Sequence, residues 1–445
     1  MVKFAQLPKY EAYKDSGVEW LGEIPCGWSL KPGFVAFSEN KRSNKGMIEN
    51  TVLSLSYGHI VIRPEEKLTG LVPESFETYQ LVEPGDIIVR CMDLQNDKVS
   101  LRTGLSKSKG IITSAYLNLK VNNDFESRFI HYYLHSLDTT KVLYRFGSGL
   151  RQNLSFLDFK RLPVFSIPKN IQTIIADYLD QKTAQIDAAI AIKEQQIELL
   201  KERKQIIIQQ AVTQGLDPNV PMKDSGVDWI GKIPAHWGIT PIKRICEAYG
   251  RIGFRGYNTS DLVNEGEGAI TLSPSNLTEY EMDFTKCSYL SWEKYYESPE
   301  IQIMESDILI VKTGSSFGKT GFVNYLPMKA TINPQLLVLK SIKVNCKYLY
   351  LLISSSNWQE QIKKRVIGST IPTISETRLL SMQATVPPEE EQDKIILYID
   401  EKLSEIDEII NLQHEQVNLF KEYKTTLINS AVTGKIKITP EMVEQ

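Results

Sequence analysis

Two stretches of the chain place apolar residues at alternating spacings of four and three, the pattern of a left-handed coiled coil. One such stripe usually means ordinary core packing. Here the second stretch, 394–433, repeats the first, 171–213, about 220 positions later, with a lysine at the same point of each stripe. The stripes are Ile186, Ile190, Lys193, Ile197, Leu200, Lys204, Ile207 and Ala211, and Ile406, Ile410, Gln413, Val417, Phe420, Lys424, Leu427 and Ala431.

The repetition in register predicts two long helices that pack against each other within one chain. About 40 helical residues span roughly 60 Å at 1.5 Å per residue. We therefore expect the helix pair to act as a ruler. If the helices are antiparallel, the blocks that precede them lie at opposite ends and are related by a pseudo-dyad.

A second repeat shows that the duplication includes more than the helices. The stretch 14–28, KDSGVEWLGEIPCGW, returns as 223–237, KDSGVDWIGKIPAHW, with ten of fifteen positions identical. Each copy reads as a turn followed by an extended segment, and its tryptophans favour a structural anchor over a ligand contact.

A block with strand-like runs follows each anchor, and the two blocks differ more than their flanks. Residues 51–62 alternate as a strand broken at Tyr57-Gly58. Turn residues precede two buried strands, IIVR ending at Arg90 and ILIVK ending at Lys312, and further strands are expected at 111–120 and 331–340. A helix then closes each block, capped by Asp124 and running through Arg145 in the first, and capped by Asn345 and running through Arg365 in the second.

The composition excludes several classes of protein. The chain has 445 residues, enough for two to four domains, and neither a run of eighteen apolar residues nor an apolar leader, so we expect no membrane contact. Its five cysteines are scattered and form no CxxC pair, which favours a reducing cytoplasm and argues against a zinc site or disulfide framework.

The formal net charge of −3 comes from one helix. Residues 1–166 carry 21 basic and 18 acidic side chains, residues 222–385 carry 18 and 16, and residues 386–434 carry 4 and 11. Both blocks are therefore mildly basic, which permits DNA binding without requiring it.

The search for catalytic chemistry yields no catalytic residue and no metal ligand set. His131 and His135 share a helix face without further ligands, so a surface helix is the favoured interpretation. The stretch 314–320, GSSFGKT, is one residue short of a phosphate-binding loop; a nucleotide triphosphatase is the least favoured alternative, and a DNA phosphate contact by Lys319 the better one.

Polar side chains on corresponding loops are the candidates for DNA binding, since Arg can grip guanine and Asn or Gln adenine. The predicted DNA-binding residues of the first block are Arg42, Tyr57, His59, Arg90, Asp93, Gln95, Asn96, Arg102, Lys107 and Arg151. Those of the second block are Arg251, Arg255, Tyr257, Asn258, Asn276, Lys312, Ser315, Ser316 and Lys319.

Over nearly its whole length the sequence resembles the specificity subunits of type I restriction-modification systems. The resemblance rests on KDSGVEWLGEIP and KDSGVDWIGKIP, on the helix starts ADYLDQKTAQID and ILYIDEKLSEID, and on GDIIVR and SDILIVKTGSSFGKTG within the blocks. One departure is KNIQTII at the start of the first helix, where the family commonly has an acidic run.

The resemblance implies an α/β fold: two target-recognition domains separated by an antiparallel coiled coil of two long conserved helices, with a pseudo-two-fold repeat. The expected division is 1–166 and 222–385 for the domains, 167–213 and 386–434 for the helices, 214–221 for a linker and 435–445 for a tail.

The resemblance also implies that each domain reads one half of a bipartite, asymmetric site in double-stranded DNA, with the helices setting the spacer. Two methyltransferase subunits would dock on the helices, and motor-nuclease subunits would join them. S-adenosylmethionine, ATP and Mg would bind to those partners, and this chain would bind no cofactor and catalyse no reaction. The resemblance further implies a cytoplasmic protein of a bacterium or an archaeon. The alternative from another class is a coiled-coil scaffold whose blocks bind proteins.

Overall fold

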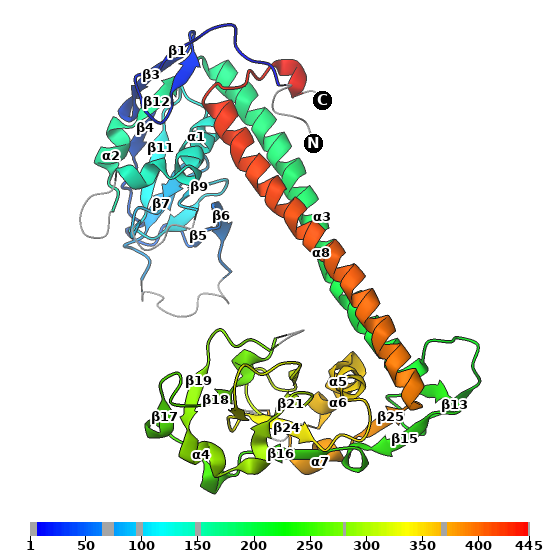
Figure 1. Ribbon diagram of the computed structural model, residues 1–445. Helices are drawn as coiled ribbons and strands as arrows, with labels where there is room; N and C mark the ends of the chain where they lie inside the picture. The colour runs from blue at the N-terminus through cyan, green and yellow to red at the C-terminus, as the bar shows by residue number, and fades with distance from the viewer. Residues whose placement is uncertain are drawn as a thin grey trace. The chain divides into compact units, whose positions relative to one another are not determined.

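The computed structural model of this chain describes residues 7–64, 75–94, 101–146, 153–278, 282–365 and 372–443. These form two compact units: unit 1 consists of residues 1–194 and 414–445, and unit 2 of residues 195–413. Each unit contains one α/β domain and a part of each long helix, α3 (Lys169–Gln214) and α8 (Glu389–Val432) (Figure 1).

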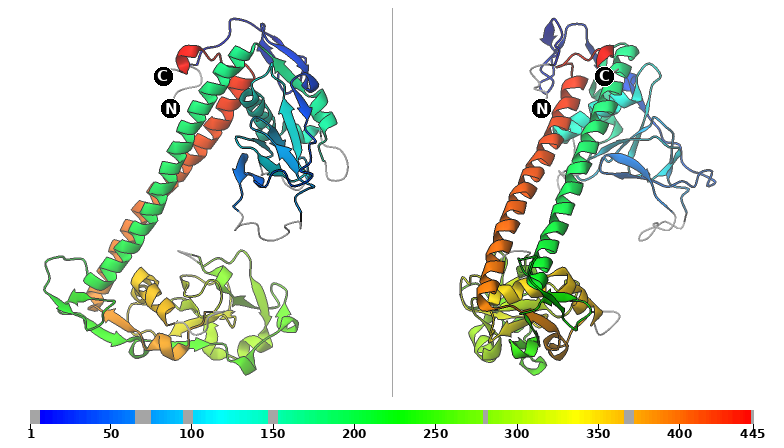
Figure 2. Two further views of the ribbon diagram at one scale, coloured as in Figure 1. Left: turned by 180° about the vertical axis from the view of Figure 1, so that it is seen from behind. Right: turned by 90° about the vertical axis from the view of Figure 1, so that its right-hand side faces the viewer.

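The two long helices pair antiparallel, as predicted. In unit 1 Asp187 pairs with Lys424 and Glu194 pairs with Lys421, so residue numbers rise along one helix as they fall along the other. Both views of Figure 2 show the two helices side by side there. Six apolar stripe positions in the middle of the helices are each less than a tenth exposed: Ile186, Ile190, Ile197, Ile406, Ile410 and Val417.

Unit 1 builds its domain on a four-stranded antiparallel sheet in the order β4 (Phe37–Glu39), β11 (Leu117–Val121), β8 (Ile87–Val89), β9 (Thr103–Leu105). Two further pairs are β7 (Gln80–Val82) with β10 (Gly110–Ile112), and β3 (Ser29–Pro32) with β12 (Pro163–Ser166). Two hairpins are β1 (Tyr13–Asp15) with β2 (Glu23–Pro25), and β5 (Leu53–Ser56) with β6 (His59–Ile62). The helices are α1 (Ser127–Thr139) and α2 (Phe156–Arg161).

Unit 2 repeats this plan. Its sheet has the order β16 (Glu247–Gly250), β24 (Leu336–Lys340), β21 (Ile308–Val311), β22 (Thr320–Phe322), and the pairs β13 (Met222–Asp224) with β14 (Lys232–Pro234) and β15 (Gly238–Pro241) with β25 (Gln383–Val386) recur. A five-stranded sheet differs from unit 1: β17 (Leu262–Val263), β19 (Ser288–Ser291), β18 (Gly268–Leu272), β23 (Ala330–Ile332), β20 (Gln302–Ile303). The helices are α4 (Trp292–Tyr296), α5 (Cys346–Ser354), α6 (Ser356–Lys364) and α7 (Glu376–Leu380).

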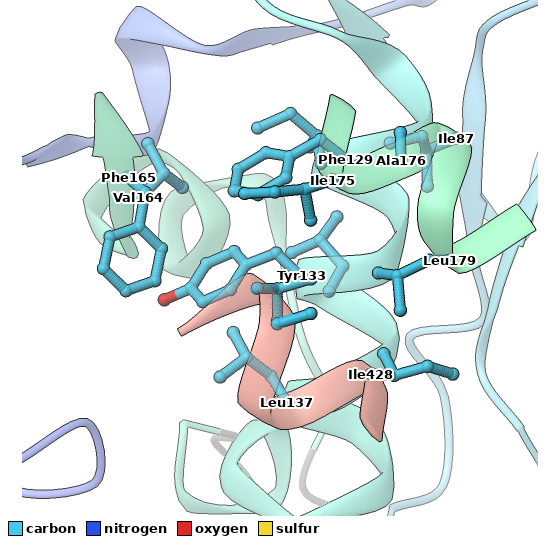
Figure 3. Packing of buried hydrophobic residues seen from close by; sticks show 14 of the residues in the cluster. Ile87, Phe129, Tyr133, Leu137, Val164, Phe165, Ile175, Ala176, Leu179 and Ile428 are labelled. Carbon is cyan, nitrogen blue, oxygen red and sulfur yellow. The ribbon is translucent and has the colours of Figure 1, made fainter. Parts of the chain in front are cut away.

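The core of unit 1 joins the domain to the long helices. Figure 3 shows α1 side chains packed against α3 and α8, and all of those labelled are almost fully buried: Phe129, Tyr133 and Leu137 of α1, Ile175, Ala176 and Leu179 of α3, Ile428 of α8, Val164 and Phe165 of β12, and Ile87 of β8. Burying one such Phe or Leu contributes about 2 kcal/mol. The helix faces therefore belong to the same core as the sheet.

Local expectations from the sequence are confirmed at several points. The break at Tyr57-Gly58 is the turn of the β5–β6 hairpin, with φ angles of 47° and 78°. Trp28 and Trp237 are buried anchors, and Asn345 caps α5 by accepting hydrogen bonds from the backbone N–H groups of Lys347 and Tyr348.

Other local expectations are wrong. The cap of α1 is Glu126, not Asp124, because the Glu126 carboxylate accepts the backbone N–H of Arg128. The runs 111–120 and 331–340 each contain two strands in different sheets, since a turn interrupts each of them. The helix expected up to Arg365 breaks between α5 and α6 at Ser355, whose backbone is extended.

The predicted domain boundaries follow the order of elements along the chain, whereas the compact units divide both long helices. The boundaries stay a prediction.

Candidate nucleic-acid interface

Unit 1 has a cleft of about 750 Å³ between its domain and the long helices, which we call the first cleft. Three sequence-predicted residues lie in its wall: Tyr57 at the hairpin turn, His59 on β6 and Lys107 after β9. The Tyr57 side chain is 89% exposed. The hairpin and the segment after β9 thus present an aromatic ring and a cation where a ligand can reach them.

The floor of the first cleft is held by ion pairs with the long helices. The Arg128 guanidinium donates to Asp180 Oδ2 at 2.8 Å, and Lys424 Nζ donates to both carboxylate oxygens of Asp187 at 2.7 Å. These carboxylates neutralise two of the cations in the wall. Lys107 is exposed and makes no ion pair with the residues that the structure describes, so its charge is available to an anion.

Two histidines of α1 line the same cleft, and the sequence had favoured a surface helix for them. Burial, with the positive charge of His135, His59 and Lys107 adding to it, lowers the pKa of His131 to about 3. Burial and the charge of Lys424 and His59 lower the pKa of His135 to about 4. The His131 Nε2 atom is buried without a hydrogen-bond partner among the described residues. Both imidazoles are therefore neutral at neutral pH, and the helix is a core helix of unit 1.

Unit 2 has a corresponding cleft of about 540 Å³, the second cleft. Lys347 Nζ donates to Asp400 Oδ2 at 2.6 Å, and Lys204 Nζ donates to Asp407 Oδ1 at 2.7 Å. Arg128 and Lys347 are each the second residue of their helix, and the other ion-pair members differ by 220 in number. The frame of the cleft is therefore duplicated.

The linings of the two clefts are unlike. Where the first cleft has His131 and His135, the second has Tyr350 and Ser354. The second cleft is also lined by Lys319, from the loop before β22, and by Thr320, the first residue of β22. A common frame with different lining residues is suited to two different ligand sequences.

The loop that contains Lys319 does not have the surroundings of a nucleotide-binding loop. A phosphate-binding loop leads into a helix whose N-terminus faces the phosphates, but residues 314–319 lead into strand β22. Gly314 and Gly318 have φ angles of 105° and 85°, so the loop is a tight glycine turn that exposes Lys319. The nucleotide triphosphatase alternative is therefore rejected.

Three predicted DNA-binding residues are buried within the protein. Arg102 is fully buried, and its Nη1 atom donates to the carbonyls of Arg90 and Met92 at 3.2 and 2.7 Å. Arg251 donates from Nε to the Ile332 carbonyl at 3.1 Å. Asn276 donates to the Asp283 carbonyl at 2.9 Å. They shape the loops from inside, so we withdraw them from the candidate interface.

Two further candidates are arginines with local carboxylate partners. Arg42 contacts Glu83 at 3.6 Å, and Arg255 pairs with Glu300 at 3.1 Å. Both pairs lie at or near the surface, where an ion pair stabilises a fold by less than about 1 kcal/mol. A DNA phosphate could therefore replace either carboxylate.

The other described candidates also lie at or near the surface. The Asn258 side chain accepts the Ser260 N–H, and the backbone N–H of Asp93 donates to Asn153 Oδ1 at 2.9 Å. The remaining members are partly or fully exposed: Arg90, Tyr257, Lys312, Ser315 and Ser316. Gln95, Asn96 and Arg151 lie outside the described residues.

The residues that sequence reasoning missed are those that frame the clefts. Arg128 and Lys347 are single basic residues on helices, with no local pattern to distinguish them from other surface cations. The one sequence feature that could have indicated them is that they occupy matching positions in the two copies of the repeat. Among the residues that the structure describes, no group of His, Cys, Asp and Glu is placed to hold a metal ion, and no helix is long and apolar enough to cross a membrane.

Each domain is mildly basic and has a cleft with the same ion-paired frame and a different lining. Residues 253–419 match the family model described as the type I restriction modification DNA specificity domain. With the relatives described next, this match confirms the resemblance seen in the sequence, to the DNA specificity subunits of type I restriction-modification systems, and supports recognition of DNA sequence as the function.

Relatives with known names support the assignment. The chain is 22% identical over 339 residues to the type I restriction enzyme MjaVIII specificity subunit of Methanocaldococcus jannaschii, covering 74% of this chain and 75% of the relative. It is 23% identical over 372 residues to the type I restriction enzyme EcoBI specificity subunit of Escherichia coli, covering 79% and 72%.

Solved structures share the fold. One is a chain from work on complex assembly and conformational transition of the type I R-M system, with a TM-score of 0.66, 15% identity, and coverage of 92% of this chain and 98% of that one. The HsdS subunit from Thermoanaerobacter tengcongensis has a TM-score of 0.50 at 15% identity, with coverage of 93% and 98%.

Proposed function

We propose that each domain reads its half-site with the loops at the mouth of its own cleft, and that this chain supplies recognition while partner subunits supply chemistry. The observation that carries the proposal is the pair of clefts with the same ion-paired frame and different linings. Because the frames match, each domain can present its loops to a duplex in the same manner. Because the linings differ, the two half-sites differ in sequence.

In the first domain, the reading elements are the β5–β6 turn and the segment after β9. Tyr57 is exposed at the turn, where its ring can stack or pack against bases, and Lys107 offers a cation to a phosphate. In the second domain, Lys319 has the phosphate role, since the tight glycine turn around it lets the duplex backbone approach closely.

The phosphate role of Lys319 is tested by Lys319→Ala in the complete complex. We expect weaker binding to every DNA sequence and a slope of log K against log salt that is smaller by about one, because one fewer counterion is released. The matched control is Lys232→Ala, since Lys232 is exposed on β14 and does not line the second cleft. Loss of affinity for one base pair only would contradict the phosphate role.

We further propose that methyltransferase subunits dock on the long helices, and that S-adenosylmethionine, ATP and Mg bind to these and the motor-nuclease partners. In unit 2, apolar side chains are exposed on both helices: Leu199 and Ile206 of α3 at 55% and 53%, and Ile409 and Leu412 of α8 at 43% and 57%. Leu199 and Ile206 are seven residues apart, so they share one helix face. An exposed apolar face rimmed by charges is typical of a protein interface.

The docking surface is tested by Leu199→Glu combined with Ile206→Glu. We expect the variant to lose copurification with the methyltransferase subunits while the isolated chain keeps its unfolding temperature, because both positions are exposed. The control is Lys201→Glu, on another face of the same helix. Unchanged copurification of the double variant would move the docking site elsewhere.

A further inference from the structure

The domain of unit 1 is attached to α3 by a polar cluster around Arg128, which we call the first latch. Its guanidinium donates to Asp177 Oδ1 at 2.7 Å and to Asp180 Oδ2 at 2.8 Å from Nη1, and to Glu126 Oε1 at 2.9 Å from Nε. The Tyr132 hydroxyl donates to Asp180 Oδ1 at 2.7 Å. Both oxygens of Asp180 are thus used by the domain.

Additional hydrogen bonds hold the start of α1 on α3. The Gln172 side-chain oxygen accepts the Glu126 backbone N–H at 3.0 Å, and the Gln172 amide donates to the Ile167 carbonyl at 2.8 Å. Burial raises the pKa of the Tyr132 phenol, so this group stays a hydrogen-bond donor throughout the working range of pH. Residues in two successive turns of α1, Arg128 and Tyr132, therefore bond α3 and fix the orientation of α1 on it.

The corresponding cluster in unit 2, the second latch, is smaller. The Gln392 bond to the backbone of Asn345 recurs at 2.8 Å, the Asn345 side-chain amide donates to Asp393 Oδ1 at 2.9 Å, and Lys347 pairs with Asp400. However, position 397, which corresponds to Asp177, is an exposed leucine, and Leu351 stands where Tyr132 stands in unit 1. The ammonium of Lys347 bonds one carboxylate of α8, where the planar guanidinium of Arg128 bonds two of α3.

The angle of a domain on its helix matters because the reading loops lie away from the attachment. Adding one base pair to a DNA spacer moves a half-site by about 3.4 Å and rotates it by roughly one tenth of a turn. A domain fixed at one angle accepts one such position. A domain that can tilt by a few ångströms at its loops accepts neighbouring positions as well.

We propose that Arg128 is a positioning residue that restricts the spacer length accepted by the complex, by fixing the first domain on α3 through Asp177 and Asp180. Lys347 restricts spacing less than Arg128 does, because it bonds one carboxylate of its long helix and Arg128 bonds two. This role rests on the proposed reading of two half-sites, and it concerns the distance between them, while the loops at the clefts decide the bases.

The experiment uses the complete methylating complex and a pool of DNA duplexes that contain both half-sites. The half-sites are identified beforehand from the methylation pattern of the wild type. The spacers in the pool range from about three base pairs shorter to about three base pairs longer than the native spacer. For Arg128→Ala we expect the preference for the native spacer over its neighbours to fall about tenfold, as for a charge-assisted, partly exposed contact. The bases preferred within each half-site stay the same. For Lys347→Ala the fall is smaller.

Three further variants make the result specific. Tyr132→Phe removes only the hydroxyl and keeps the ring, so it relaxes spacing even where Arg128→Ala fails to fold. Arg128→Lys keeps one ion pair and restores part of the preference. Glu198→Gln breaks an exposed pair with Lys201 on the same helix and leaves spacing unchanged.

Loss of methylation by the same factor at every spacer, or an altered base preference, would assign Arg128 a merely structural or reading role and overturn the proposal. Failure of the proposed function is a different outcome: the wild-type complex would then show no pair of half-sites at a defined spacing.

Discussion

Single residues in the coiled-coil stripe decide how the long helices pair. Lys204 is 2% exposed and bonds both oxygens of Asp407 at 2.7 and 2.9 Å, and Lys424 bonds Asp187 in the same way in unit 1. A buried ammonium needs its partner, because an uncompensated charge in a core is strongly unfavourable. A lysine in a stripe therefore favours the antiparallel register that brings an aspartate to it.

Lys204→Ala is expected to lower the free energy of unfolding by about 2 kcal/mol, since the stripe loses a packed stem and Asp407 loses its partner while remaining partly hydrated. Urea titration followed by circular dichroism measures this effect. The control is Lys201→Ala, whose exposed pair with Glu198 contributes no more than about 0.5 kcal/mol. Equal effects for the two variants would contradict a special role for the stripe lysine.

The two histidines of the first cleft predict a pH dependence of stability. In the folded chain the pKa values of His131 and His135 are about 3 and 4, whereas an unfolded histidine has a pKa of about 6.5. Below pH 6.5 the unfolded state binds protons that the folded state does not. The two histidines therefore leave the free energy of unfolding unaffected above about pH 6.5 and lower it progressively as the pH falls toward their folded pKa values of about 3 and 4.

The measurement is the urea midpoint at pH 7.5 and at pH 5.0, two values on either side of the unfolded pKa of about 6.5, for the wild type and for His131→Gln with His135→Gln. We expect a clear drop in the wild type and a smaller one in the double variant, which lacks both titrating groups. Identical drops would show that other groups cause the acid sensitivity.

At the scale of elements, two neighbouring residues of the β5–β6 turn are expected to have different roles, Tyr57 in DNA binding and Gly58 in stability. Tyr57 adopts a φ angle of 47°, which bulky residues rarely adopt but asparagine tolerates. Tyr57→Asn is therefore expected to keep or slightly raise stability while it weakens binding to the first half-site, because the exposed ring is lost. Thermal unfolding and DNA affinity, measured together, check this pair of outcomes.

Gly58→Val is the complementary variant. Gly58 has a φ angle of 78°, and an added Cβ would lie 3.0 Å from Leu101 Cδ1, so valine strains the turn. We expect both stability and binding to fall. If Tyr57→Asn were to lower stability as much as Gly58→Val, the ring would have a structural role.

Elements with a strong local signal were predicted from the sequence. The long helices, the buried strands β8 and β21 and the turn at Tyr57-Gly58 follow from periodicity and turn chemistry within a few residues. The splitting of 111–120 into β10 and β11 was not predictable, because the two strands pair with different partners far along the chain.

At the scale of the whole molecule, duplication makes the two reading functions separable. Each domain has its own core and its own cleft, formed by residues of one unit only. Exchange of residues 240–370 for the corresponding block of a related subunit is therefore expected to change one half-site of the methylated sequence and leave the other unchanged. With the methyltransferase partners proposed above, sequencing of the methylated DNA sites reports both halves at once. A simultaneous change of both would show that the domains do not read independently.

The sequence by itself determined the duplicated plan and the long paired helices, because repeats and apolar periods are local and can be read directly along the chain. Its motifs also carried the resemblance that indicated the class of function. Only the tertiary structure decided which polar residues are placed to serve recognition. Arg102 and Lys107 lie close together in the sequence, yet the first is buried against carbonyls and the second is exposed in the first cleft.

The physical reason is distance along the chain. Arg128 and Asp180 form their contact across 52 residues, and nothing in the neighbourhood of either residue indicates the other. Whether a loop cation points into the protein or toward a ligand depends on which distant carbonyls and carboxylates the fold brings beside it. That choice is made by packing, after the local elements have formed.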